Sequence, residues 1–310
     1  MTDIKDVVII GGGVGGTSVA LYLARAGYKP TLITSGDIGG SLNDIELIQN
    51  YVGIYNAVGS EVAESIVGQL SQSGLELDEH LITDSYVREV SRYKANLWEV
   101  TYTNIVGAYE KIIAKNVVVA TGMRHKKLEH ISEAIQHNCV LCDGFMYKDK
   151  EVIVVGGGSS AVTEAIELAR IAKKVRVVRR SENYRAEKIL VDKMRELDNV
   201  FEHVGSVSHF EETDALFIHE GDYSQIFKTK DCGLFVYIGS EPNSDFLPQE
   251  IKKNVFGHLE AQNNHAVDIN DEIVDNLYVV GDIGTSESKQ FGIAIGQGTE
   301  VGIELIKKLS

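Results

Sequence analysis

One pattern of glycines occurs twice in the chain, in the same register and 145 residues apart, with glycines at positions 11, 13 and 16 and then glycines at 156 and 158 followed by Ala161. Each copy opens with a short, continuous apolar run, which is typical of a parallel strand buried on both faces. Apolar residues then recur at helical spacing, and a second apolar strand follows. Two strand–turn–helix–strand units predict an α/β fold with two Rossmann-like dinucleotide-binding domains, each built in three layers.

The residue types at these turns suit a dinucleotide. Gly11 or Gly156 allows the tight turn, Gly13 or Gly158 lets backbone N–H groups approach a pyrophosphate, and a small third residue lets helix and strand pack closely. The second helix opens with Ser159 and Ser160. In both copies the helix N-terminus brings unpaired N–H groups and a positive dipole end toward the phosphates. The alternative is a glycine-rich turn that holds no ligand.

The residue 23 positions after the first glycine reads the ribose in such domains. In the second copy it is Arg179, which Arg180 and Arg185 follow closely; in the first copy it is Thr34. Three guanidinium groups match a 2′-phosphate and favour NADPH over NADH. The alternative is a basic turn exposed to solvent. Thr34 stands where such domains usually have an acidic residue that binds the ribose, although its hydroxyl can still form a hydrogen bond to a ribose.

A Cys-x-x-Cys pair, Cys139 and Cys142, comes just before the second copy and is followed by Asp143. Zinc would need two further ligands at matching spacing, so no metal is expected. A pair this close can close a small disulfide ring, and Asp143 could move a proton for thiolate chemistry. The alternative is two buried cysteines acting as small apolar residues. The third cysteine, Cys232, is expected in the core.

Composition excludes several kinds of partner. The net charge of −15 argues against nucleic acid and against an anionic membrane. Low cysteine usage, with no signal peptide and no transmembrane run, predicts a reduced, cytoplasmic protein. His125, His130 and His137 are expected to be solvated. The order of motifs predicts that residues 1–122 and 244–310 form one discontinuous domain, interrupted by an inserted domain at 123–243.

Taken together, these residues resemble the low-molecular-weight bacterial type of thioredoxin reductase over nearly the whole chain. The resemblance is carried by the ordered motifs at 11–16, 39–42, 50–53, 120–122, 139–144, 156–162, 179–188, 233–239, 242–243, 281–282 and 289–290. Departures include Val140 and Leu141, bulky residues inside the cysteine pair, and Lys289, where the family usually carries Arg.

The resemblance implies FAD in the interrupted domain and NADPH in the inserted one. FAD is expected at Gly11, Gly13, Gly16, Thr34, Gly40, Ser41, Asn50, Thr121, Gly122, Gly281, Asp282, Lys289 and Gln290. NADPH is expected at Gly156, Gly158, Ser159, Ser160, Arg179, Arg180, Arg185 and Gly239. It further implies that Cys142 reacts at the flavin, that Asp143 supplies the proton, and that Cys139 exchanges with thioredoxin or a similar small dithiol protein. A homodimer and a rotation between the domains are also implied.

Other hypotheses share the flavin and the dithiol. An oxygen-dependent dithiol oxidase would need no reader for NADPH, and its relatives tend to carry His after the second cysteine. A ferredoxin-dependent relative would be expected to lose the arginines. A flavin-binding redox sensor would show no turnover. The arginines and Asp143 favour the NADPH-dependent disulfide reductase.

Overall fold

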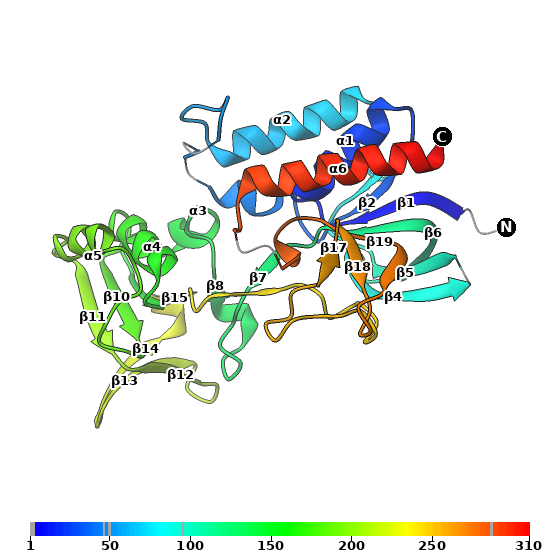
Figure 1. The fold of residues 1–310 in the computed structure, drawn as a ribbon. Coiled ribbons are helices and arrows are strands. Elements are labelled where there is room, and N and C mark those ends of the chain that lie inside the picture. The colour runs from blue at the N-terminus through cyan, green and yellow to red at the C-terminus, as the bar shows by residue number, and fades with distance from the viewer. Residues whose placement is uncertain (1–3, 46, 49–50, 95, 286–287) are drawn as a thin grey trace. The chain divides into compact units, whose positions relative to one another are not determined.

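The computed structural model describes residues 4–45, 47–48, 51–94, 96–285 and 288–310, with the backbone alone at 133, 141 and 142. The chain divides into two compact units. Unit 1 contains residues 1–124 and 241–310, and unit 2 contains residues 125–240. One unit is therefore inserted into the other, and each is described by itself below (Figure 1).

Unit 1 is built on a mixed sheet whose main path runs β17-β18-β19-β6-β1-β2-β3. The strands β19, β6, β1, β2 and β3 pair in parallel, whereas β5 pairs with β6, and β4 with β5, in antiparallel fashion. Its strands are β1 (Ile4–Ile10), β2 (Thr31–Ile33), β3 (Leu81–Ile82), β4 (Tyr86–Lys94), β5 (Leu97–Thr103), β6 (Tyr109–Val119), β17 (Ala261–Gln262), β18 (His265–Val267) and β19 (Ile273–Val279). Its helices are α1 (Val14–Arg25), α2 (Gly59–Gln72), α6 (Phe291–Leu309) and the short η1 (Gly40–Asp44) and η5 (Gly281–Ile283).

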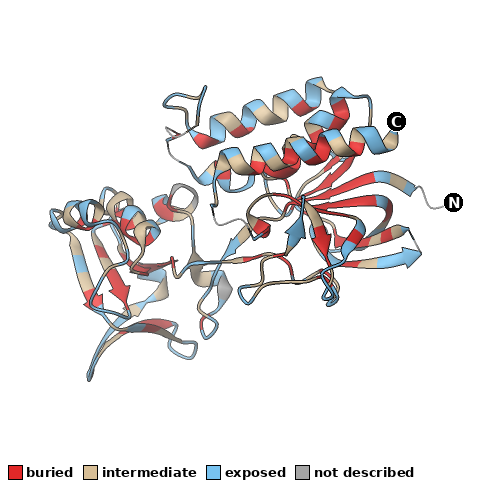
Figure 2. Cartoon of the chain, viewed as in Figure 1, coloured by how far each residue is buried: buried red, intermediate tan, exposed pale blue. Residues whose placement is uncertain are grey.

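The alternation of side chains along β1 divides unit 1 into three layers. Val7 and Ile9 pack in one core with residues of α1 and α6, whereas Val8 and Ile10 pack in another with residues of β4 and β5. Trp98 of β5 is 1% exposed in this second core, on a strand that is antiparallel to both β4 and β6. Both faces of the parallel strands are therefore covered, and Figure 2 shows buried residues concentrated in these strands.

Unit 2 repeats the same layering. Its parallel sheet has the order β11-β10-β9-β15-β8, and a separate antiparallel sheet has the order β12-β13-β14. Along β9, Val152 and Val154 pack against α4, and Ile153 and Val155 pack against the antiparallel sheet. The strands are β8 (Gln136–His137), β9 (Glu151–Val155), β10 (Lys174–Arg179), β11 (Val200–Val204), β12 (Ser206–Phe210), β13 (Ala215–Glu220), β14 (Tyr223–Lys228) and β15 (Cys232–Val236). The helices are α3 (Val140–Asp143), α4 (Ser159–Ala169), α5 (Lys188–Arg195), and the short η2 (Glu133–Ile135), η3 (Gly144–Tyr147) and η4 (Thr229–Asp231).

Two short strands, β7 (Met123–His125) and β16 (Ser240–Pro242), pair with each other where the chain leaves and re-enters unit 1. The observed divisions fall inside these strands, after 124 and after 240. The predicted α/β fold of two Rossmann-like domains is confirmed. Among the described helices, none combines the length and apolar character needed to cross a membrane.

Candidate functional site

In unit 1 the first glycine turn connects β1 to α1 and requires glycine for two reasons. Gly11 has φ +111°, and a Cβ there would lie 2.3 Å from the Ala120 carbonyl oxygen. A Cβ on Gly16 would lie 2.1 Å from the Gly11 carbonyl oxygen. The turn geometry and the contact between helix and strand thus fix these two glycines without reference to any ligand.

The middle glycine of each turn has no such packing reason. At Gly13 (φ −69°) and at Gly158 (φ −95°), an added Cβ would find no atom of the described residues within 4 Å. Each is the residue just before a helix, α1 or α4, and in the described part of the chain neither cap residue makes a side-chain hydrogen bond to its helix. Open space beside uncapped backbone N–H groups is what a bound pyrophosphate needs. Both turns therefore fit a dinucleotide.

Other predicted residues of unit 1 gather at this turn. The Gly39 amide donates to the Gly12 carbonyl at 2.8 Å, which brings the loop that contains Gly40 and Ser41 against Gly13. Thr34, at the end of β2, packs against Gly12, where a Cβ would lie 2.9 Å from the Thr34 hydroxyl oxygen. Asn50 lies outside the described residues.

Lys289 organises the second predicted cluster of unit 1. Its Nζ donates to the carbonyl oxygens of Asp282 and Gly284, both at 2.7 Å, and so holds the turn after β19. Burial raises the pKa of the Asp282 carboxyl, although Lys289 and His258 oppose this. Burial likewise lowers the pKa of Lys289. Gln290 follows immediately as the cap residue of α6.

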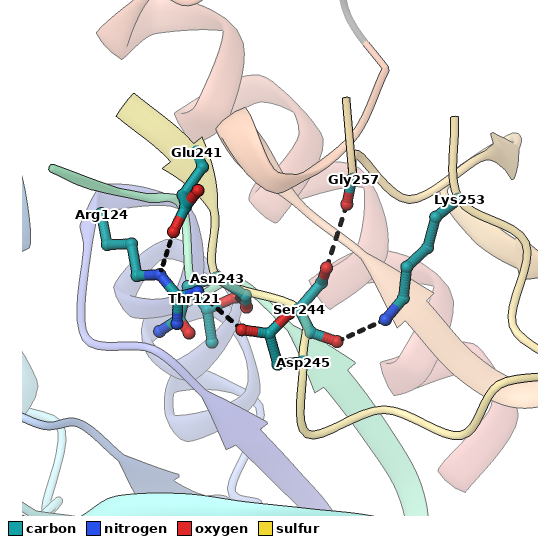
Figure 3. Close-up of polar contacts among 8 residues, drawn as sticks. All are labelled: Thr121, Arg124, Glu241, Asn243, Ser244, Asp245, Lys253 and Gly257. Carbon is teal, nitrogen blue, oxygen red and sulfur yellow. Dashed lines mark hydrogen bonds and ion pairs between the residues drawn. The ribbon is translucent and has the colours of Figure 1, made fainter. Parts of the chain in front are cut away.

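The segments that link the units are held together within unit 1 by polar contacts (Figure 3). The Thr121 hydroxyl donates to the Asn243 carbonyl at 2.7 Å, and the Asn243 amide donates to the Gly122 carbonyl at 3.2 Å. Arg124 pairs with Glu241 (2.9 Å) and Asp245 (2.6 Å). The Thr121 hydroxyl, predicted to line the FAD site, thus has a partner in the protein.

In unit 2 the second turn repeats the first. Gly156 has φ +148°, and a Cβ there would lie 2.3 Å from the Tyr237 carbonyl oxygen. The Ser159 hydroxyl, at the first residue of α4, donates to Glu187 at 2.6 Å, and Ser160 is exposed. Gly239 (φ +105°) is exposed and accepts a hydrogen bond from the Lys126 amide at 2.9 Å.

The three arginines have different surroundings. Arg179 is only 8% exposed. Its Nη2 lies 3.2 Å from a Glu202 carboxylate oxygen, and its Cζ lies 4.3 Å from the ring centre of Tyr184. Its Nε and Nη1 are buried without a hydrogen-bond partner among the described residues. Arg180 and Arg185 are exposed. Glu202 also pairs with Arg195 at 2.7 Å, and this contact is the main cause that lowers the pKa of the Glu202 carboxyl. Sequence reasoning missed Glu202, because it lies on a different strand.

The cysteine pair spans the start of α3 in unit 2. Cys139 is disulfide-bonded, whereas Cys232 is a free thiol, 4% exposed in the core, whose pKa burial raises to about 12. The side chain of Cys142 lies outside the described part of the structure. Asp143 accepts a hydrogen bond from His137, with 2.8 Å between Oδ2 and Nδ1. The expectation that His137 is solvated is wrong, since its side chain is 14% exposed and bonded at both nitrogens.

Comparison with known proteins agrees with this geometry. A family model described as pyridine nucleotide-disulphide oxidoreductase matches residues 5–298. Thioredoxin reductase from Buchnera aphidicola subsp. Acyrthosiphon pisum (strain APS) is 30% identical over 297 residues, which cover 90% of this chain and 89% of that protein. A 34.2 kDa protein in the rubredoxin operon of Clostridium pasteurianum is 25% identical, with 95% and 94% covered.

Two solved structures of similar proteins cover nearly the whole chain. Thioredoxin reductase from Streptococcus pyogenes MGAS5005 is 27% identical, with a TM-score of 0.60, and the match covers 100% of this chain and 99% of that one. Thioredoxin reductase from Lactococcus lactis has a TM-score of 0.78 at 24% identity, covers 98% of both chains, and shows the fold. With two glycine turns that fit a dinucleotide, a disulfide-bonded cysteine that precedes the second turn in the sequence, and these matches, the chain belongs to the pyridine nucleotide-disulphide oxidoreductase family.

Proposed function

We propose that the protein is a flavoprotein disulfide reductase that passes electrons from NADPH through FAD to a Cys139–Cys142 pair and then to thioredoxin or a similar small dithiol protein. The observation that carries this proposal is the space beside Gly13 and Gly158, which no atom of the described residues occupies, in front of helices α1 and α4. One such turn per unit supplies two nucleotide sites. The family and the curated relatives point to the same chemistry.

FAD would be held by unit 1. The N-terminus of α1 and Gly13 would take the pyrophosphate, and the loop at Gly40 and Ser41 already lies against that turn. Asp282, whose turn Lys289 fixes, is a candidate partner for polar groups of the flavin chain. Bound FAD supplies a two-electron carrier between a nicotinamide hydride and a disulfide.

NADPH would be held by unit 2 through the N-terminus of α4. Arg180 and Arg185 are exposed and would bind the 2′-phosphate, whereas Arg179 is already paired with Glu202. We therefore propose a division of roles among the three predicted arginines. Arg180 and Arg185 bind the phosphate. Arg179 stabilises the turn through packing, because its side chain lies beside Gly157 and Tyr184.

The dithiol would complete the reaction. In the net change NADPH, one proton and a disulfide become NADP⁺ and two thiols. Asp143, next to Cys142 in the chain, would move protons to and from the pair. Cys139 would then attack the partner's disulfide, which is reduced as the Cys139–Cys142 disulfide closes again.

We also propose a homodimer that acts in the reducing cytoplasm. The support for the dimer is the resemblance to the bacterial thioredoxin reductases, and the support for the location is the use of only three cysteines, one of them a free core thiol. Light scattering of the purified protein tests the dimer: a mass near twice 34.0 kDa is expected, and a mass near 34.0 kDa would refute it.

The experiment that tests the proposal is anaerobic mixing of the purified protein with NADPH, and separately with NADH, while flavin absorbance is followed. Rapid bleaching by NADPH and much slower bleaching by NADH is the expected result. Addition of oxidised thioredoxin should then restore the absorbance. A protein that holds no flavin, or a flavin that neither nucleotide bleaches, would refute the proposed donor and direct the search to a ferredoxin-type donor or to oxygen.

A further inference from the structure

Three side chains of unit 2 form a continuous line of hydrogen bonds that ends at Asp143. His137 is the last residue of β8, Asp143 is the last residue of α3, and Tyr147 is the last residue of η3. The His137 Nδ1 lies 2.8 Å from the Asp143 carboxylate, and its Nε2 lies 2.7 Å from the Tyr147 hydroxyl oxygen. The Asp143 side chain is 33% exposed and Tyr147 is half-buried, so neither end of the line is fully buried.

The chemistry of the three groups fixes the direction of the bonds. An ionised carboxylate only accepts, so Nδ1–H donates to Asp143, and the neutral Nε2 accepts from the Tyr147 hydroxyl. When the imidazole is protonated, both nitrogens donate, and the hydroxyl oxygen accepts instead. A proton can therefore enter at one end and leave at the other without any change in side-chain position.

The imidazole is held rigidly in this role. Its ring centre lies 5.2 Å from that of Phe235 and 5.3 Å from that of Tyr147. Phe235 is fully buried on β15, which pairs with β8 in a register that sets Phe235 beside His137. The titratable groups around the line are Asp143 on α3, Tyr147 on η3, Cys232 on β15 and Lys150, whose Nζ lies 5.6 Å from the Tyr147 ring centre. Burial, followed by Asp143 and Cys232, raises the pKa of Tyr147, so it stays a neutral hydroxyl.

We propose that His137 is a positioning residue that orients the Asp143 carboxyl and passes protons between Asp143 and Tyr147. This inference rests on the proposed function, because a dithiol that cycles must exchange protons. Two electrons open the disulfide to two thiolates, which take up two protons; reduction of the partner's disulfide returns two electrons and two protons. A carboxyl that gives up a proton in each cycle must be reprotonated, and the line through His137 supplies that path.

Two conservative substitutions separate proton transfer from packing. In His137→Gln the amide N–H can still donate to Asp143 but does not relay a proton. Tyr147→Phe keeps the ring and removes the hydroxyl. Each variant is expected to slow NADPH-dependent disulfide reduction about tenfold, less than the 10²–10⁴ of a direct general acid. The double variant should be no slower than either single one, since both cut the same line.

The matched control is His130→Gln, in the same unit, where the exposed histidine lies 2.9 Å from the Val207 carbonyl oxygen. Its turnover should equal that of the wild type, and bleaching of the flavin by NADPH should be unchanged in all variants. Wild-type disulfide reduction in His137→Gln from pH 5 to 9 would overturn the inference. Additive losses in the double variant would do the same.

A second readout needs no turnover. The reduced protein is treated with iodoacetamide between pH 5 and 9, and modification of Cys139 is followed by mass spectrometry. The pH profile of His137→Gln should be displaced from those of the wild type and His130→Gln, because an imidazole can carry charge beside Asp143 and an amide does not. If the wild type reduces no disulfide with NADPH, the proposed function fails; a displaced profile then still supports the role of His137, and superimposable profiles overturn it.

Discussion

The proposed division of roles among the arginines of unit 2 gives the sharpest prediction. Replacement of Arg180 and Arg185 by Ala should remove two exposed guanidinium groups from the 2′-phosphate. A hydrogen bond to a charged group contributes about 1.5–3 kcal/mol, or about ten- to a hundredfold in affinity for each arginine. The KM for NADPH of this double variant should rise at least about tenfold. The KM for NADH, which has no 2′-phosphate, should change little.

Arg179→Met should behave differently. The Arg179 guanidinium is 8% exposed and faces Glu202 and Tyr184, so its loss removes contacts within the protein rather than with the nucleotide. Glu202 keeps Arg195 as a partner, with 2.7 Å between Oε1 and Nε, and is not left as an unpaired charge. The expected loss is therefore about 1–3 kcal/mol of unfolding free energy, with the preference for NADPH retained.

The assay is steady-state reduction of a disulfide substrate at varied NADPH and NADH, together with urea unfolding of each variant. Arg170→Ala is the control, because that arginine is 65% exposed and pairs with Glu167 on the same helix surface. A loss of NADPH preference in Arg179→Met, with none in the Arg180/Arg185 variant, would refute the assignment of roles.

Further predictions concern the dithiol, the turns and the charges. Cys142→Ser should leave a flavin that NADPH bleaches but should abolish disulfide reduction; retained reduction in a thioredoxin assay would contradict the role of the pair. Gly158→Ala should fold normally, since the added methyl group comes within 4 Å of no described atom, yet it should raise the KM for NADPH at least tenfold; an unchanged KM would argue against a pyrophosphate at this turn. Lys289→Met removes the donor to two carbonyl oxygens, so fluorescence titration should show weaker FAD binding. An equal affinity would mean that the turn keeps its conformation without Lys289. The pKa of Glu202 is lowered in the folded protein from 4.5, so its stabilisation is present above about pH 4.5 and is lost as pH falls through the lowered value. Urea unfolding should therefore show a gap between wild type and Glu202→Gln that shrinks in acid, and a gap that is constant from pH 3 to 7 would contradict the ion pair.

Local patterns were sufficient where the chemistry is local. The glycine turns could be predicted because strand, turn and helix are consecutive, and the positive φ at Gly11 and Gly156 follows from that geometry. The strand β5 is also specified locally, because Trp98, Val100 and Tyr102 alternate with polar residues, a pattern typical of an antiparallel strand. In each case the residues that determine the structure lie within one short segment.

Contacts between distant segments were not predictable in the same way. Arg179 meets Glu202 only because β10 and β11 pair in parallel with a register that no local pattern specifies. His137 was expected to be solvated because its partners, Asp143 and Tyr147, reach it only when α3 and η3 fold back onto β8. The proximity of His137 to Cys139 in the sequence was the one signal that could have drawn attention to it.

The pairing of β7 with β16 has a consequence for protein engineering. Since the two strands are neighbours, the first and last residues of unit 2 lie close together. Excision of residues 125–240 would leave ends at 124 and 241 that a short linker can join. The entropic cost should be small, because the entropy lost when a loop closes grows only slowly with the length of the loop. The same adjacency makes the excised segment a candidate for independent expression, and it makes this junction a natural place to graft a different nucleotide-binding module.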